Sequence, residues 1–256
     1  MKILAIGDVV GPASINYLAR RLGVYRTANG VDLVVVNGEN AATGNGLTRA
    51  DADALLDAGA DVITTGNHVW KWREIRDYLD ESPFVVRPAN YPAACPGSGC
   101  TLIDAVGKRI LVMNVSGVVY LDALADPFDA VEKMLADNAG KYDAAVLDVH
   151  AEATSEKAAI ARYFDGRIDC VWGTHTHVQT SDARILPRGT GFITDLGMTG
   201  PVESILGVTS EIIITKFRTH MPVKFSVPDG EIRAYGALFT LDRDLKRAVE
   251  VKAVSF

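Results

Sequence analysis

The chain has few cysteines, no excess of positive charge and no long apolar run, and each absence argues against a class of protein. Its three cysteines, Cys95, Cys100 and Cys170, are odd in number and lack CxxC spacing, so we expect neither a disulfide framework nor a zinc site built on thiolates. The first apolar run stops at Asp8, too early for a signal-peptide core or a membrane span. These features predict a soluble, cytoplasmic protein without a membrane partner.

Positive charge is in the minority, with 26 Lys and Arg against 32 Asp and Glu and a net charge of −6. Because nucleic-acid backbones are held mainly by clustered Lys and Arg, this balance argues against an extended nucleic-acid surface. A small phosphorylated ligand is still compatible with the charge if a metal ion supplies the positive centre. We therefore expect a small-molecule partner, and the sequence leaves the choice between a monomer and a homo-oligomer open.

Apolar material for a core is plentiful, at 48% hydrophobic residues. No repeat, low-complexity tract or linker divides the chain, so we expect one domain over residues 1–256. Short apolar runs that alternate with amphipathic segments predict βα units. The expected strands are 3–6, 31–36, 61–65, 144–149 and 168–172, and the expected helices are 14–28, 48–58, 72–79, 127–138 and 155–164.

Turn residues between other apolar runs predict antiparallel pairs as well. We expect residues 100–106 to pair with 109–115, 184–186 with 191–194, and 223–227 with 232–241, with a final strand at 248–254. Residues 210–217 are compatible with either a helix or a strand.

Polar side chains with metal-ligand chemistry recur where the predicted βα strands end. Each is ordinary by itself, since an acid such as Asp8 often caps a turn and a His-x-His pair is often only polar loop. Their recurrence is less ordinary, because the carboxyl ends of parallel strands gather at one edge of a sheet. Four of the five histidines are among these donors, which are Asp8, Glu39, Asn40, Asn67, His68, His150, His175 and His177.

Carboxylate, amide and imidazole donors without thiolate point to Fe, Mn or Zn. With one imidazole set aside, the seven remaining donors are too many for one tetrahedral ion, whereas two ions about 3.5–4 Å apart, bridged by a carboxylate and a hydroxide, would use them and would suit phosphoester hydrolysis. In that reaction the bridging hydroxide attacks phosphorus. One imidazole should then stay uncoordinated to protonate the leaving oxygen.

The order of these motifs resembles a known superfamily. Gly66-Asn67-His68 and the segment 173–177, with His150 between them and Asp8 early in the chain, are similar to the motifs of the calcineurin-type metallophosphoesterases. Residues 7–11, 37–42, 148–157 and 195–201 look like the YmdB-type branch of that superfamily, bacterial phosphodiesterases associated with 2',3'-cyclic nucleotides. The resemblance covers nearly the full length of the chain.

The resemblance implies an α/β fold, a four-layer α/β/β/α sandwich with two mixed β-sheets. It implies two divalent or mixed-valence ions, with Fe or Mn favoured over Zn. One ion would be held by Asp8, Glu39, Asn40 and His177, and the other by Glu39, Asn67, His150 and His175, so that Glu39 bridges them. His68 would remain free as the proton donor, and Thr43, Gly44 and Asn45 would border the substrate.

Three positions depart from the superfamily pattern. Val10 stands where the first motif normally has histidine, a place that Asn40 can fill, and Glu39 replaces the usual aspartate of the second motif. Val69 replaces an aspartate that often follows the catalytic histidine, so His68 would lack that orienting carboxylate.

The predicted function is hydrolysis of small cyclic nucleotides by a dinuclear metal centre. A phosphomonoesterase of the same chemistry is the nearest alternative, and a metal-stabilised regulatory or RNA-associated protein with weak catalysis is a second. The sequence indicates no base-recognition pocket and no Arg or Lys that would clamp a phosphate.

Overall fold

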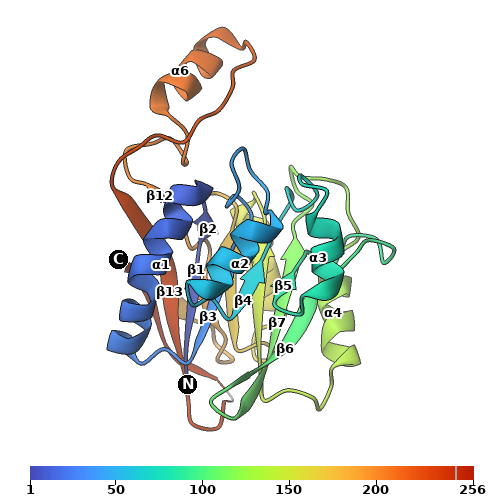
Figure 1. Ribbon diagram of the computed structural model, residues 1–256. Helices are drawn as coiled ribbons and strands as arrows, with labels where there is room; N and C mark the ends of the chain where they lie inside the picture. The colour runs from blue at the N-terminus through green and yellow to red at the C-terminus, as the bar shows by residue number, and fades with distance from the viewer. Residues whose placement is uncertain (246) are drawn as a thin grey trace.

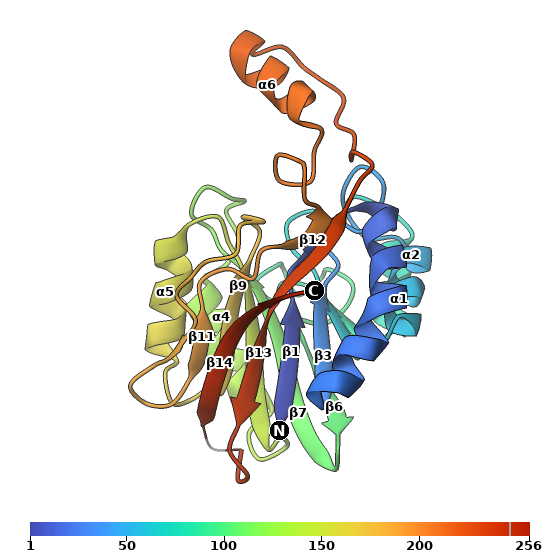
Figure 2. The ribbon, with the colours of Figure 1, turned by 90° about the vertical axis from the view of Figure 1, so that its left-hand side faces the viewer.

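The computed structural model describes residues 1–245 and 247–256, and in these residues two β-sheets stack face to face between two layers of helices (Figure 2). The first sheet has eight described strands. Its parallel part is β1 (Lys2–Ile6), β3 (Leu33–Asn37), β4 (Val62–Thr64) and β5 (Val85–Val86), and its other strands are β2 (Asp8–Val9), β12 (Met198–Pro201), β13 (Ile232–Leu241) and β14 (Ala248–Ser255). Because β13 runs antiparallel to β1, this sheet is mixed.

The second sheet has six described strands. In spatial order they are β10 (Arg184–Ile185), β11 (Gly191–Ile193), β9 (Cys170–Thr174), β8 (Ala144–His150), β7 (Lys108–Ser116) and β6 (Cys100–Ala105). The four inner strands are parallel to one another and the two edge strands are antiparallel to them. The predicted pairs 100–106 with 109–115 and 184–186 with 191–194 are therefore confirmed.

Helices cover the outer face of each sheet. The first sheet carries α1 (Gly11–Asn29), α2 (Arg49–Asp57) and α3 (Ile75–Glu81), and the second carries α4 (Pro127–Asp137) and α5 (Thr154–Tyr163). Three apolar clusters fill the spaces between these layers. Leu18 and Leu22 of α1 pack on the first sheet, Trp172 and Phe239 lie between the sheets, and Ile160 of α5 packs on the second sheet. The predicted four-layer sandwich is confirmed.

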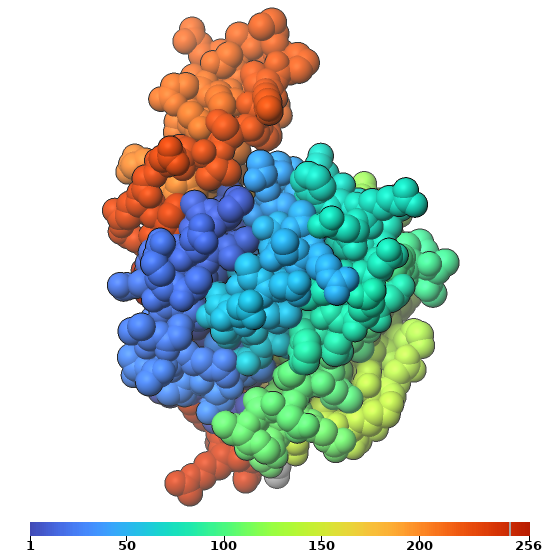
Figure 3. Space-filling model, viewed as in Figure 1, coloured from blue at the N-terminus to red at the C-terminus, as the bar shows by residue number. Residues whose placement is uncertain are grey.

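An arm formed by residues 202–231 projects from this body and carries α6 (Ser210–Thr219) at its far end (Figure 1). In the space-filling view the arm stands above α1 and the loop that precedes α2 (Figure 3). Its two limbs are joined near the base, where the Thr209 N–H donates to Ser226 O at 2.9 Å. The segment 210–217, which the sequence left open, is thus helical. Among the described helices, none is long and apolar enough to cross a membrane.

One predicted strand pair is wrong. Residues 223–227 form no strand and belong to the returning limb of the arm, while β13 pairs with β1, β12 and β14. The alternating apolar residues at 223, 225 and 227 suggest a half-buried strand, but in the structure Phe225 and Val227 line a cavity at the base of the arm.

Element boundaries also shift by a few residues. The helix expected from residue 72 begins at Ile75, and the one expected from residue 14 begins at Gly11 with Pro12 in its first turn, a favoured position for proline. Strand β9 covers 170–174 rather than 168–172. The short strands β2, β5 and β12 are absent from the sequence prediction, because such short paired segments leave no periodic signal in the sequence.

Candidate metal centre

All eight predicted donors meet at one edge of the sandwich, where strands of both sheets end. The first sheet supplies Asp8, Glu39, Asn40, Asn67 and His68, and the second supplies His150, His175 and His177. Contacts join the two sets: Asn67 Oδ1 lies 2.9 Å from His150 Nε2, and Asn40 Nδ2 lies 3.1 Å from His177 Nε2. The site is therefore assembled from both halves of the chain.

The three histidines of the second sheet are each anchored through one ring nitrogen. His150 Nδ1 lies 3.0 Å from Thr174 Oγ1, which itself donates to Asp148. His175 Nε2 lies 3.1 Å from Glu152 Oε2, and His177 Nδ1 lies 3.0 Å from Leu206 O. Such outer partners fix the tautomer of a metal-binding imidazole and turn its other nitrogen toward the metal site.

The other nitrogen of each ring faces the shared centre. His150 Nε2 and His175 Nδ1 lie 3.1 Å apart, and His177 Nε2 lies 3.7 Å from Asp8 Oδ1. Burial lowers the pKa of His150 well below its usual value, so that ring stays neutral, as a metal ligand must be.

Backbone geometry explains how a pair two residues apart can reach one centre. His175 and His177 have φ values of 96° and 64°, in the left-handed region that residues other than glycine seldom adopt. The turn is held by side chains from elsewhere: the His175 N–H donates to Asp8 Oδ2 at 3.0 Å, and the Thr176 N–H donates to Asp195 Oδ2 at 3.3 Å.

Asp8 and Glu39 bring negative charge into the buried centre. Both side chains are fully buried, and Asp8 Oδ1 and Glu39 Oε2 have no hydrogen-bond donor among the described residues. Burial raises the pKa of Asp8, but the nearby imidazoles of His177 and His150 and the His175 N–H outweigh it, and the pKa falls below its usual range. Burial raises the pKa of Glu39 despite the adjacent His68.

His68 lies against Glu39 and is 36% exposed at its side chain. Its backbone N–H donates to Glu39 Oε1 at 2.7 Å, and its Nδ1 lies 2.9 Å from the same oxygen without the direction of a hydrogen bond. The neighbouring carboxylate raises the pKa of the ring. Glu39 is thus the carboxylate that lies beside the His68 ring, a neighbour that the sequence did not indicate.

A polar network behind the donors has no counterpart in the sequence prediction. Asp148, fully buried within β8, accepts from Thr64 Oγ1 at 2.5 Å, Asn37 Nδ2 at 3.0 Å and Thr174 Oγ1 at 2.8 Å. Burial raises the pKa of Asp148 to about 7. The sequence did carry one signal of this network, which is an Asp inside an otherwise apolar predicted strand, because a buried charge needs polar partners.

A buried ion pair supports the histidine turn from below. Lys157 Nζ, from α5, lies 2.6 Å from Asp195 Oδ2, and both side chains are fully buried. Burial raises the pKa of Asp195 in spite of the lysine. Since Asp195 also accepts from the Thr176 and Gly197 N–H groups, this pair ties α5 to the segment between the two metal-ligand candidates.

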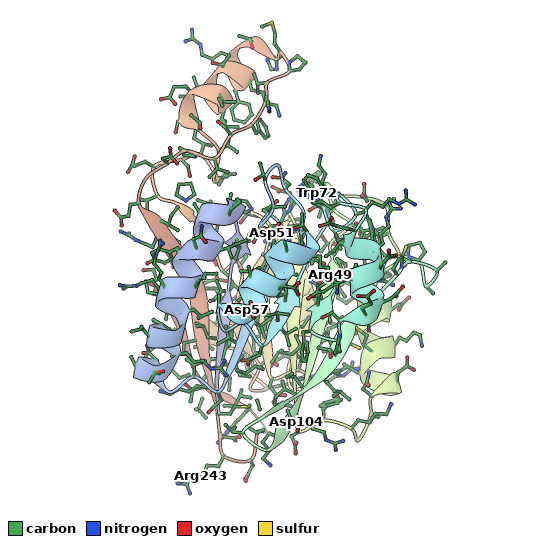
Figure 4. The ribbon with its side chains drawn as sticks, in the orientation of Figure 1. Arg49, Asp51, Asp57, Trp72, Asp104 and Arg243 are labelled. Atoms are coloured by element: carbon green, nitrogen blue, oxygen red, sulfur yellow. The ribbon has the colours of Figure 1, made fainter. Side chains whose placement is uncertain are left out.

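The loop expected to border the substrate, Thr43 to Asn45, lies at the rim of the centre. It is fixed to the next βα unit, because the Trp72 indole donates to Asn45 O at 2.9 Å (Figure 4 labels Trp72 at this end of the body). Thr43 and Gly44 are exposed, and all three residues line the cavity below the arm.

The donor set fits metal ions. In the described part of the chain, no three His, Cys, Asp or Glu side chains form an arrangement that could hold an ion as they stand; here the donors contact one another. Yet within the residues that the structure describes, two buried carboxylate oxygens lack a hydrogen-bond donor, and the inner imidazole nitrogens beside them contact only other proposed ligands, so a cation would satisfy both sets.

Fold and donors together define a protein of the metallophosphoesterase type, which implies divalent metal ions as cofactors. The sandwich is shared with a 5'-nucleotidase precursor from Thermus thermophilus, at a TM-score of 0.61 over 100% of this chain and 54% of that one, although only 11% of residues are identical. That likeness concerns the fold alone.

The chain belongs to the YmdB-like protein family, whose sequence profile matches residues 4–254. It is 45% identical over 254 residues to the 2',3'-cyclic-nucleotide 2'-phosphodiesterase of Bacillus subtilis, covering 99% of this chain and 96% of that protein. A novel phosphatase from Mycoplasma pneumoniae has a similar structure, with a TM-score of 0.93 and 32% identity over 100% of this chain and 93% of that one. The recognised family is therefore confirmed.

Proposed function

We propose that this protein is a metal-dependent phosphodiesterase that hydrolyses nucleoside 2',3'-cyclic phosphates. The observation that carries the proposal is a set of three anchored imidazoles beside two buried carboxylates. The inner nitrogens of His150 and His177 lie 3.6 Å from Glu39 and 3.7 Å from Asp8, and that of His175 lies 3.1 Å from His150 Nε2. The substrate class is supported by the name of the Bacillus subtilis relative, which aligns over nearly the full length and shares 45% of its residues.

We assign the ligands as the family resemblance implies: Asp8, Glu39, Asn40 and His177 for one ion, and Glu39, Asn67, His150 and His175 for the other. In support, His177 lies near Asp8 and Asn40, and His150 contacts Asn67 and His175. Bound ions would neutralise phosphate charge and lower the pKa of a coordinated water. Fe or Mn fits these oxygen and imidazole donors better than a thiolate-dependent ion would.

His68 is the proposed general acid. Its ring is partly exposed at the rim, and the Glu39 carboxylate raises its pKa, which favours the protonated form that a general acid needs. Hydrolysis breaks one of the two ester P–O bonds of the cyclic phosphate, and the departing sugar oxygen needs one proton. His68 can donate it, which would leave a nucleoside monophosphate as product.

We also propose that residues 1–256 act as one domain in the cytoplasm. The centre draws ligands from both sheets, so neither half of the chain could build it alone. The free thiols of Cys95, Cys100 and Cys170 suit a reducing compartment.

A substrate panel tests the proposal directly. The protein, supplied with Mn or Fe, is assayed on 2',3'-cyclic nucleotides, 3',5'-cyclic nucleotides, nucleoside monophosphates and RNA. We expect the largest kcat/KM for the 2',3'-cyclic esters. Preference for monophosphates would favour the phosphomonoesterase alternative, and RNA binding that survives metal removal, without hydrolysis of any ester, would favour a regulatory protein.

Glu39→Gln tests the bridging assignment. Because one carboxylate would serve both ions, its neutralisation should lower occupancy of both together, and metal analysis by mass spectrometry measures this. Loss of one equivalent with the other retained would contradict a bridging role.

A further inference from the structure

A cavity of ≈ 430 Å³ opens between the base of the arm and the metal centre. One wall is the start of α1 with the Thr43–Asn45 loop, and the other is formed by both limbs of the arm, at Leu206–Val208 and Lys224–Asp229. Asn40 and His177 also line it. The cavity is therefore continuous with the proposed ligands of one ion.

The size of this cavity is within the range of small-molecule sites, which occupy about 300–1,000 Å³. A cyclic phosphate that reaches the ions must place the rest of the substrate nearby, and this cavity begins at two of the proposed ligands. It offers room for that part of the molecule.

The lining has the chemistry of a nucleoside site. Pro12, Leu206, Phe225 and Val227 are apolar, and Leu206 and Phe225 keep 48% and 43% of their surface exposed. Aromatic and apolar side chains that stay exposed beside a cavity are suited to contact the flat face of a base. Thr43 and Asn45 on the facing wall add a hydroxyl and an amide that can bond to base edges or sugar hydroxyls.

The arm holds this wall in place at the metal centre. The Leu206 carbonyl accepts the Nδ1 hydrogen bond of His177 at 3.0 Å, and the limbs are joined at Thr209 and Ser226. Phe225 is held from one side by Lys216 Nζ, which lies 4.7 Å from the ring centroid. This contact favours one orientation of the ring.

We infer that this cavity binds the nucleoside part of a nucleotide ligand, with Phe225 as the surface against which the base packs. The inference rests on the proposed function for its substrate class. In this proposal the arm forms one wall of the specificity site, and the metal centre of the sandwich carries out the reaction.

Binding and turnover are measured separately to test it. The metal-loaded wild-type protein is titrated calorimetrically with adenosine 3'-monophosphate and with glycerol 2-phosphate, which carries a phosphate but no nucleoside. In Phe225→Ala we expect about 10- to 100-fold weaker binding of the nucleotide, since stacking of one base contributes about 1–3 kcal/mol, and unchanged binding of glycerol phosphate.

Phe217→Ala is the matched control. Phe217 is also a phenylalanine of the arm, 70% exposed on α6, but it does not line the cavity. Its replacement should leave both affinities unchanged. Ala13→Phe, which fills the cavity from the exposed first turn of α1, should weaken only nucleotide binding by a route that does not alter the arm.

Equal nucleotide affinity in wild type and Phe225→Ala would overturn the inference. Equal losses for nucleotide and glycerol phosphate would overturn it too, because they would mean that the arm acts through His177. If nucleotide binding depends on Phe225 but no 2',3'-cyclic nucleotide is hydrolysed, the inference stands and the proposed function fails.

Discussion

At the scale of single residues, His68 differs from the other histidines of the centre. His150, His175 and His177 each have one nitrogen held by a partner outside the centre, whereas the His68 ring contacts Glu39 within it. A proton donor gains from partial exposure, since it must exchange protons with water after each turnover. This difference separates the proposed ligands from the proposed acid.

His68→Ala should therefore retain both metal ions and lose about 10²- to 10⁴-fold in kcat, the range expected on removal of a general acid. Metal analysis beside steady-state kinetics on a 2',3'-cyclic nucleotide measures both quantities. Near-normal turnover in a fully metallated variant would remove His68 from the mechanism.

The donors could be predicted from the sequence, and their anchors could not. Asp8, Glu39 and His150 each follow an apolar run, so their position at a strand end is visible in the order of residues. Glu152 looks like an ordinary helix-start residue, and Leu206 O is a backbone atom with no sequence signal. Their role arises only when the second sheet and the arm are brought against the histidines.

At the scale of elements, the strand ends of the two sheets are closely packed against each other. Gly66, which follows β4 closely, shows how near they come, because a Cβ added there would lie 2.2 Å from His150 Nε2. Glycine at this position lets one sheet's loop pass the other sheet's imidazole.

Gly66→Ala should displace the His150 ring, lower metal occupancy and reduce kcat/KM by about a hundredfold, the effect of a misplacement near 1 Å. Gly23→Ala is the control: it lies inside α1, where an added Cβ meets nothing within 4 Å, so we expect normal kinetics and a gain of about 0.5–1 kcal/mol in unfolding free energy. Full metal content and normal activity in Gly66→Ala would contradict the packing argument.

The ion pair between α5 and the histidine turn gives a second prediction for elements. Lys157→Met leaves the Asp195 carboxylate buried without its cation, and removal of one partner of such a pair costs about 3–5 kcal/mol. The double variant Lys157→Met with Asp195→Asn keeps an acceptor for the Thr176 N–H and leaves no buried charge at this pair. It should lose much less unfolding free energy than Lys157→Met alone.

Urea unfolding of the two variants and the wild type measures the difference, and metal titration reports on the turn itself. An equal loss of stability in the single and double variants would show that the charge of Asp195 is not the cause.

At the scale of the whole molecule, the sandwich separates an end that carries the donors from an opposite end that does not. Asp169, which precedes β9 at that opposite end, donates nothing to the site and accepts from the Ala145 N–H at 2.8 Å. Burial raises its pKa to about 6. This carboxyl therefore affects stability without being part of the reaction.

The sign of its effect follows from proton binding. Between about pH 4 and 6 the folded state holds the Asp169 proton more tightly than the unfolded chain, so its contribution to unfolding free energy falls as pH rises through this window. Asp169→Asn should thus become more stable relative to wild type from pH 4 to pH 7, by about 1–3 kcal/mol. Urea unfolding at several pH values measures this.

Asp143→Asn is the control of opposite sign. The Arg109 N–H lowers the pKa of this exposed carboxyl, so its favourable contribution is present at neutral pH and lost as pH falls. The unfolding free energy of Asp143→Asn should therefore fall relative to that of wild type as pH rises. The same trend in both variants would contradict the assignment to Asp169.

The sandwich could be predicted from the sequence more fully than the arm of residues 202–231. Alternating runs indicate the βα units and the sandwich, but an arm with no sheet to pair with produces the same apolar alternation as a strand. The pattern at Phe225 and Val227 predicts a strand for this reason. Exposure, which decides between the two, is not visible in a local pattern.

The hydrogen bond from His177 to Leu206 O has a thermodynamic consequence. It couples the arm to a proposed ligand, so a ligand in the cavity that steadies Leu206 would raise affinity for the ion at His177. By reciprocity the ion must raise affinity for that ligand by the same factor. The affinity for the metal ion and the affinity for the nucleoside would then depend on each other through one coupling free energy.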